Sequence, residues 1–211
     1  TMNHAVNKIL SVKVFMYTYN AKKQGWWKEI TLLVWGPSAK LLSEDEELQD
    51  YVKNLDKSTL GHSAEFSRYE FGGSEILDSL HKKLMPLAMD FFESQTLVPS
   101  FNFGSWYYGQ ASLEKHRDVA PCTYSIDLCV YQNTPWDLYV EGVPYTLQEN
   151  EALLYYGEGQ KHWREEFPDS GNNVVCNVFF FYVEPDHWSI IEPEEKHDII
   201  RRQNAIERNL S

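Results

Sequence analysis

The chain has 211 residues, a formal net charge of -12 and 43% hydrophobic residues, which is enough for one domain with a sizeable core. The negative charge argues against a nucleic-acid partner, because such binding depends largely on Lys and Arg. The longest apolar run, Val178–Val183, has the length of a strand, so we expect no membrane association. Cys122, Cys129 and Cys176 are odd in number and widely spaced, which indicates reduced thiols in a cytoplasmic protein.

The first hundred residues predict a hairpin followed by two helices. Val12–Tyr19 and Lys28–Trp35 are rich in β-branched and aromatic residues and flank a turn-like segment, which favours paired strands. Ser43 and Glu46 have capping-box spacing at the start of an acidic turn, so we expect a helix to begin there. A second helix is expected from about Ser74, where apolar residues recur at helical spacing.

After residue 97 the pattern changes to short strands separated by Gly, Pro, Asn and Asp. The expected strands are Phe101–Tyr108, Cys122–Tyr131, Trp136–Val140, Ala152–Tyr156 and Val174–Val183. Many short strands with frequent turns indicate a sandwich or a jelly roll. We therefore expect a single domain over 1–211, with N-terminal strands and supporting helices in 1–96, a β core in 97–185 and a C-terminal tail in 186–211.

Three side chains in the β-rich half are candidate metal ligands. His116 and Asp118 are separated by one residue, so at the end of a strand their side chains face the same side. His162 lies 44 residues after Asp118, behind an apolar strand and a Gly-rich turn, and can add a third ligand. Two imidazoles and one carboxylate on one face of a metal leave positions free, which is typical of non-haem Fe(II) oxygenases.

Residues 105–183 resemble the double-stranded β-helix core of the Fe(II)/2-oxoglutarate-dependent dioxygenases, especially the prolyl-hydroxylase-like branch. The resemblance rests on short segments in the family's order: Tyr107–Gly109, His116–Asp118, Trp136–Gly142, Glu151–Gly157, His162–Glu165 and Val178–Val183. It implies a mainly β fold with flanking helices around a jelly-roll, cupin-like core. It also implies that His116, Asp118 and His162 hold the iron.

The resemblance further implies the reaction. Members of the family bind Fe(II), 2-oxoglutarate and O2, and they release succinate and CO2 as they oxidise a substrate C–H bond. A hydroxylase acting on an amino acid, a peptidyl side chain or a small metabolite is the expected activity. Asp118 favours hydroxylation, because related halogenases carry a small residue in place of this carboxylate.

The chain departs from the family where the distal carboxylate of 2-oxoglutarate is usually anchored. Many members have an Arg or Lys at the start of the last core strand, but here Asn172 and Asn173 occupy these positions and Val174–Val183 has no basic residue. Arg164 is the nearest alternative, and it shares a strand face with His162. Arg164 is equally open to a contact with substrate or to an ion pair with a nearby Glu.

Further expectations about the pocket follow from alternation along the strands. Tyr108 is expected to donate a hydroxyl to the cosubstrate, in competition with Tyr107 on the opposite face. Asn177 on the last strand is expected to line the pocket. Trp163, next to a candidate ligand, is expected to face away from the site and to pack beneath the helices. Basic residues near the candidate ligands in sequence suit a dicarboxylate: Lys115, Arg117, Lys161 and Arg164.

Two other classes of function fit the same residues. A zinc hydrolase would use His116, Asp118 and His162 to activate a water. A β-sandwich binding module would use an aromatic groove and no metal. We expect a small-molecule or peptide substrate, and the sequence indicates no oligomeric state.

Overall fold

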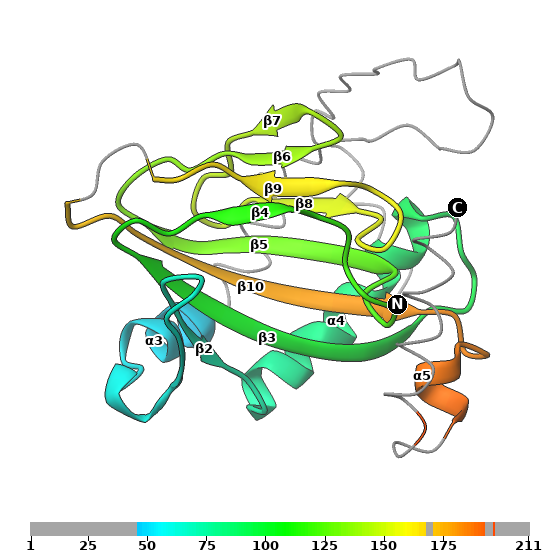
Figure 1. Cartoon of the computed structure of the whole chain (residues 1–211). Helices are drawn as coiled ribbons and strands as arrows, with labels where there is room; N and C mark the ends of the chain where they lie inside the picture. The colour runs from blue at the N-terminus through cyan, green and yellow to red at the C-terminus, as the bar shows by residue number, and fades with distance from the viewer. Residues whose placement is uncertain (1–45, 168–170, 193–195, 197–211) are drawn as a thin grey trace, which may run out of the picture.

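The computed structural model describes residues 46–167, 171–192 and 196, on which all structural statements rest (Figure 1). The hairpin expected at 12–35, Ser43, and residues 193–195 and 197–211 of the expected tail lie outside these residues. Among the described helices, none has the length and apolar character needed to cross a membrane.

Two antiparallel sheets face each other and form the jelly roll (Figure 1). The larger sheet has the order β1-β2-β3-β10-β5-β8, with β1 at Gly61–Ser63, β2 at Arg68–Phe71, β3 at Val98–Tyr108, β10 at Val174–Val183, β5 at Tyr124–Gln132 and β8 at Ala152–Tyr155. The smaller sheet has the order β4-β9-β6-β7, with β4 at Leu113–His116, β9 at His162–Arg164, β6 at Leu138–Val140 and β7 at Val143–Tyr145. The expected mainly β fold with a jelly-roll core is confirmed.

The long strand β10 is the centre of the larger sheet. It pairs along its length with β3 on one side and with β5 on the other. All but its first residue are buried, which explains why the sequence of this strand is a nearly continuous apolar run. Its alternate side chains face either the helices or the space between the two sheets.

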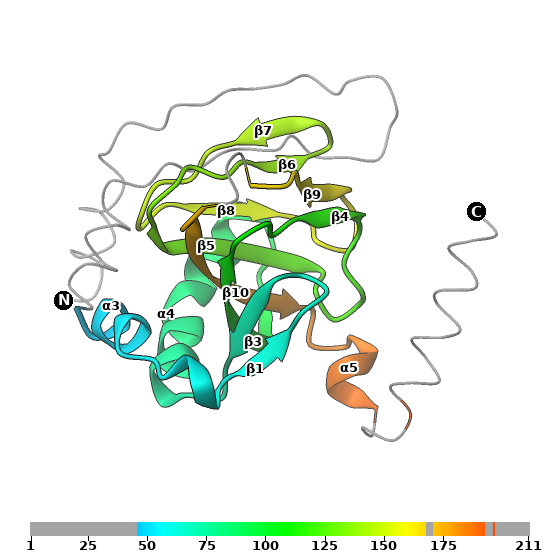
Figure 2. The same ribbon diagram turned by 60° about the vertical axis from the view of Figure 1, so that its left-hand side comes forward.

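The helices α3 (Glu46–Lys53) and α4 (Glu75–Phe91) cover the outer face of the larger sheet, as the two ribbon views show (Figures 1 and 2). The Oγ of Ser74 accepts a hydrogen bond from the backbone N–H of Leu77, so α4 begins where the sequence indicated. Leu77 and Leu80 of α4 pack in one core cluster with Phe180 of β10. This cluster packs against the outer face of the larger sheet and supports it, while the pocket lies on the opposite face of the sheet.

Several short elements were not expected from the sequence. The strands β1, β2 and β7 have three or four residues each, which is too short for a clear alternating pattern. A 3-10 turn, η1 (Lys57–Thr59), precedes β1, and the short helix α5 (Trp188–Ile191) follows β10. The β1–β2 hairpin matters for function, because it extends the larger sheet to the rim of the pocket.

Candidate metal centre

The three candidate ligands come from the end of β4 and the start of β9. His116 is the last residue of β4 and His162 is the first residue of β9, and the two are direct cross-strand partners. Asp118 lies two residues beyond β4, where its backbone N–H donates to the carbonyl oxygen of Gly157 at 2.9 Å. This bond ties the loop after β4 to the loop between β8 and β9.

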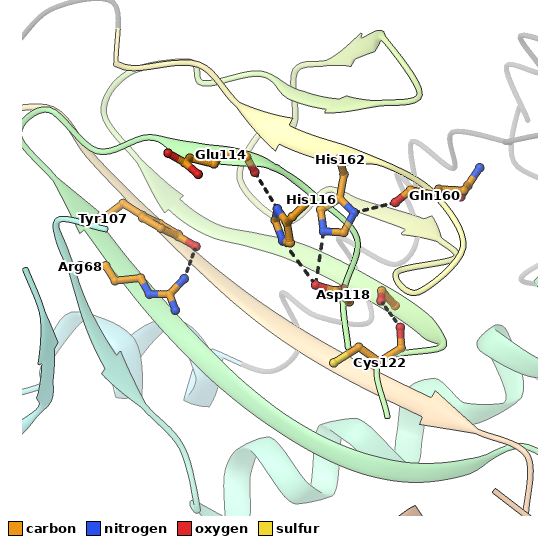
Figure 3. A network of polar contacts seen from close by, with 9 residues as sticks. Arg68, Tyr107, Glu114, His116, Asp118, Cys122, Gln160 and His162 are labelled. Carbon is orange, nitrogen blue, oxygen red and sulfur yellow. Dashed lines mark hydrogen bonds and ion pairs between the residues drawn. The ribbon is translucent and has the colours of Figure 1, made fainter. Parts of the chain in front are cut away.

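The ligand atoms of these residues converge on one point (Figure 3). Nε2 of His116 and Nε2 of His162 lie 3.5 and 3.4 Å from Oδ1 of Asp118, and the three ligand atoms are all within 4.8 Å of one another. The two imidazole rings have centroids 4.3 Å apart. The His162 side chain is 3% exposed and that of His116 is 36% exposed, so the cluster opens to solvent on the side of β4.

The far nitrogen of each imidazole is held by a backbone carbonyl. Nδ1 of His116 lies 2.7 Å from the carbonyl oxygen of Glu114, and Nδ1 of His162 lies 3.0 Å from that of Gln160. A carbonyl oxygen can only accept, so in each case Nδ1 carries the proton and donates. In the neutral ring Nε2 then presents its lone pair to the cluster, which is the tautomer that a metal ligand requires.

The charges of the cluster reinforce one another. Burial acts to raise the pKa of the Asp118 carboxyl, but the two imidazoles in their protonated form outweigh it through their hydrogen bonds and charges together, and lower this pKa. Burial acts to lower the pKa of His116, but the hydrogen bond to Asp118, the hydrogen bond to the Glu114 carbonyl and the charge of Asp118 together outweigh it and raise this pKa. A proton on His116 and a metal cation compete for the same Nε2 lone pair, so metal binding here releases protons.

Gly157 leaves the space that the Asp118 carboxylate fills. A Cβ atom at this position would overlap Oδ2 of Asp118, Oγ of Ser125 and the carbonyl oxygen of Cys122. Ser125 and Cys122 are buried and joined by a hydrogen bond, so their atoms cannot move aside without disturbing the packing around them. Gly157 is therefore part of the support of the site.

The residues present fit a divalent transition metal. Two imidazole nitrogens and one carboxylate oxygen on adjoining strands form a facial set, and each imidazole already has its outer hydrogen bond. The three cysteines are free and buried, and the metal-ligand group contains none of them. The donor set therefore suits iron, whereas structural zinc sites are usually rich in thiolate ligands.

A pocket of about 380 Å³ lies beside the cluster, between the two sheets. It is lined by His116, Asp118, His162, Tyr107, Tyr155, Arg164, Asp127, Phe103, Phe179, Phe181 and several neighbours. The Tyr155 ring contacts His162 with centroids 4.9 Å apart, and burial raises the pKa of its phenol well above the usual range. Tyr155 therefore stays neutral and keeps its hydroxyl proton as a donor within the pocket.

Arg164 lines this pocket but is already engaged in a buried ion pair. Its Nη2 lies 3.0 Å from Oδ2 of Asp127, and its Nη1 donates to the carbonyl oxygen of Trp136 at 2.6 Å. Burial raises the pKa of the Asp127 carboxyl, and the charge of Arg164 opposes this shift. The partner of Arg164 is thus an Asp on β5, whereas the sequence pointed to a nearby Glu.

Two of the expected cosubstrate contacts take other places. Asn177 is fully buried on β10, lies outside the lining of the pocket, and donates from Nδ2 to Oδ1 of Asp127 at 2.7 Å. Tyr108 also lies outside the lining, and its hydroxyl is 2.7 Å from Nε2 of His62. The register of β3 turns Tyr107, and not Tyr108, toward the pocket, and a contact between Tyr108 and the cosubstrate stays a prediction.

The outer face of the smaller sheet holds two residues that the sequence placed elsewhere. Trp163 faces away from the metal cluster as expected, but it stacks on Tyr139 of β6 at 5.2 Å. It does not lie beneath the helices, which cover the other sheet. The ammonium of Lys115 lies 4.3 Å from the Trp163 ring on this face, so closeness in sequence to the ligands does not bring it into the pocket.

The pocket lining includes residues for which the sequence predicted no role, among them Arg68, Asp127 and Tyr155. Asp127 had a usable signal, since an acidic residue flanked by Ile126 and Leu128 in an apolar strand requires a partner. Tyr155 follows two leucines of β8 and reads as an ordinary core residue. Arg68 had no signal, because the strand that carries it was not expected.

Comparisons with known proteins show the fold. No family model matches the chain, and no curated protein matches its sequence. The structure is similar to HygX from Streptomyces hygroscopicus, solved with nickel and 2-oxoglutarate bound, at 11% identity and a TM-score of 0.50 over 66% of this chain and 78% of HygX. An oxidoreductase of the 2OG-Fe(II) oxygenase family from Burkholderia pseudomallei matches at 11% identity and a TM-score of 0.47, over 69% of this chain and 88% of the other.

A cupin of the RmlC-like type from Shewanella frigidimarina also matches, at 9% identity and a TM-score of 0.38 over 63% of this chain and 91% of the cupin. The double-stranded β-helix that the sequence resemblance implied is thus confirmed by the strand order and by the likeness to HygX. The chain thus shares its fold with HygX.

Proposed function

We propose that this protein is a non-haem Fe(II)- and 2-oxoglutarate-dependent dioxygenase. It hydroxylates an amino acid, a peptidyl side chain or a small metabolite, and it releases succinate and CO2. The observation that carries the proposal is the convergence of two imidazole Nε2 atoms and Oδ1 of Asp118 beside the pocket, with both tautomers set by backbone carbonyls.

In this proposal His116, Asp118 and His162 hold the iron. Bound Fe(II) would supply the centre at which O2 and 2-oxoglutarate react. Three protein ligands leave the remaining coordination positions to the cosubstrate and O2. The neutral phenol of Tyr155 offers a hydrogen bond close to His162, and the Phe179 and Phe181 rings keep water from the oxidising centre.

Of the three residues expected to contact the cosubstrate (Arg164, Tyr108 and Asn177), Arg164 is the one that lines the pocket. Asp127 offsets its charge at 3.0 Å, so Arg164 offers a dicarboxylate hydrogen bonds with little net positive charge. Asn177 acts through Asp127 and holds the carboxylate that positions Arg164. The proposal therefore expects modest affinity for 2-oxoglutarate in the absence of other anchors.

The test is anaerobic titration of the purified protein with Fe(II) and 2-oxoglutarate. A weak visible charge-transfer band that needs both additions, followed by succinate release in air, supports the proposal. His162→Ala should abolish the band, whereas His62→Ala, which removes a histidine outside the pocket lining, should leave it unchanged.

Two outcomes would contradict the proposal. Tight zinc binding with no band and no succinate would indicate the hydrolase that uses the same ligands. Failure to bind any divalent metal, with ligand binding unaffected in the His162→Ala variant, would indicate a binding module.

A further inference from the structure

The end of the pocket formed by the β1–β2 hairpin has a chemistry of its own. Phe66, in the turn of this hairpin, and Arg68, at the start of β2, both line the pocket. Figure 3 shows the Arg68 guanidinium directed at Tyr107, to one side of the His116–Asp118–His162 cluster. The hairpin thus adds Arg68 and, in its turn, Glu65 to the lining of a pocket whose other arginine is paired with Asp127.

The Arg68 guanidinium is held in place by aromatic rings. Its central carbon lies 4.7 Å from the Phe66 ring centroid, 5.8 Å from that of Tyr107 and 6.0 Å from that of Phe103. The side chain is 16% exposed, and its Nε is buried with no hydrogen-bond partner among the described residues. A guanidinium with few waters and a fixed position binds an anion at a low cost in side-chain entropy.

The partners of Arg68 leave room for a ligand anion. Nη2 pairs with Oε1 of Glu70 at 2.5 Å, but the Glu70 side chain is 39% exposed and can turn to solvent. Nη1 donates to the hydroxyl oxygen of Tyr107 at a long 3.3 Å. Because this hydroxyl accepts from Arg68, its own proton is available as a second donor for the same anion.

A flat apolar surface adjoins these donors. Phe103 lies against Phe179 with ring centroids 5.0 Å apart, and Phe181 stacks with both at about 6 Å. All three rings line the pocket. Such a surface accepts the body of an aromatic or extended apolar molecule.

We propose that Arg68 and Tyr107 bind a carboxylate of the substrate, whose aromatic or apolar body lies on Phe103, Phe179 and Phe181. The identification of this ligand as the substrate rests on the oxygenase function proposed above, but its recognition does not require the metal. The substrate class is then an apolar or aromatic carboxylic acid, and Arg68 is the residue that selects its charge.

The test measures binding to the metal-free protein by isothermal titration calorimetry with 3-phenylpropionate and with its neutral amide. The acid should bind about tenfold or more tightly than the amide, because charge-assisted hydrogen bonds are lost with the amide. Arg68→Gln should remove this preference, and Tyr107→Phe should weaken binding of the acid by a few fold. Glu70→Gln, which removes the competing carboxylate, should keep or raise affinity for the acid. Lys53→Gln, on an exposed residue of α3, is the control for charge alone.

Equal binding of acid and amide to the unaltered protein would overturn the proposal, even if no variant folds. Full affinity of the Arg68→Gln variant for the acid would also overturn it. If this variant lost 2-oxoglutarate binding but kept its affinity for phenylpropionate, Arg68 would be assigned to the cosubstrate instead. Failure of the Fe(II) and 2-oxoglutarate titration, with the acid still bound through Arg68, would remove the oxygenase function and leave the anion site.

Discussion

The pocket is lined by two arginines that differ in how their charge is compensated. Arg164 on β9 is 3% exposed and pairs with Asp127, which is 1% exposed and also holds Asn177. Arg68 on β2 pairs with the half-exposed Glu70 at the rim. An ion pair sealed in the interior cannot exchange its partner without a large penalty, whereas a rim pair can. Arg164 therefore keeps Asp127 as its partner and can offer a ligand only its remaining N–H groups, whereas Arg68 can exchange Glu70 for a ligand anion.

The largest effect on stability is expected when Arg164 loses its partner Asp127. Asp127→Ala should lower the free energy of unfolding by about 3–5 kcal/mol, because it leaves a buried guanidinium uncompensated. Urea denaturation measures this change. The double variant Asp127→Leu with Arg164→Met should recover most of the loss. A loss of less than 1 kcal/mol in the single variant, on the order of a surface pair, would contradict the distinction.

A buried histidine on the other face of the larger sheet should make the stability of the protein depend on pH. His81 is 3% exposed, and its Nε2 lies 2.9 Å from the carbonyl oxygen of Phe181. Burial lowers the pKa of His81 from 6.5 to about 4. The unfolded chain therefore binds a proton at a higher pH than the folded chain, so stability present above pH 6.5 is lost as the pH falls toward 4.

This loss should reach up to about 3 kcal/mol and is measured by denaturation at a series of pH values. In His81→Gln the part of the slope due to this residue should vanish, although carboxylates still titrate. An unchanged slope in the variant would show that His81 is not the group responsible.

Added volume at Gly157, beside the candidate ligand Asp118, should also destabilise the protein. Gly157→Ala should lower the free energy of unfolding by about 1–3 kcal/mol, because the new Cβ overlaps Asp118 and Ser125. Metal affinity should fall by about 10–100-fold as the carboxylate is displaced. Calorimetric titration with Co(II) measures the affinity, and Gly142→Ala is the control, because its Cβ meets no atom within 4 Å. Gly142 has a positive φ of 86°, so this control tests backbone strain without the overlap.

The smallest effect on stability is expected at the rim. Glu70→Gln should change the free energy of unfolding by no more than about 1 kcal/mol, since its ion pair with Arg68 is partly solvated. Thermal denaturation of this variant beside Asp127→Asn gives the direct comparison of rim and interior. A loss at Glu70 equal to that at Asp127 would remove the basis for treating Arg68 as available.

The sequence carried the parts of the site that depend on local spacing. The spacing of His116 and Asp118 and the place of His162 after an apolar strand and a Gly-rich turn made the three residues candidates, and the family resemblance supported the set. The spacing did not show that Asp118 lies beyond the end of β4, where a hydrogen bond to Gly157 holds its backbone. The strand Val174–Val183 was predicted with its observed bounds because its apolar run is long. The strand pattern thus predicted a sandwich or a jelly roll, and the family resemblance selected the jelly roll.

The features that the sequence did not predict depend on how distant strands pair with one another. Whether Tyr107 or Tyr108 faces the pocket is decided by the pairing of Val175 with Tyr107 across β3 and β10, which no local pattern encodes. Arg68 enters the pocket because the β1–β2 hairpin adds to the edge of a strand that begins thirty residues later in the chain, at Val98. Side chains whose role comes from tertiary pairing are hidden from a reading of spacing alone.

The pairing of His116 with His162 gives a bound ion a mechanical role besides chemistry. The strands β4 and β9 have four and three residues, and their register shifts between Leu113 and His116. Strands this short hold their alignment weakly, and a slip by one residue would turn one imidazole to the outer face. An ion bound to both rings and to Asp118, which is itself tied to Gly157 after β8, would hold β4 and β9 in register. Metal binding and correct strand alignment would then be coupled, so that removal of the ion would destabilise the smaller sheet.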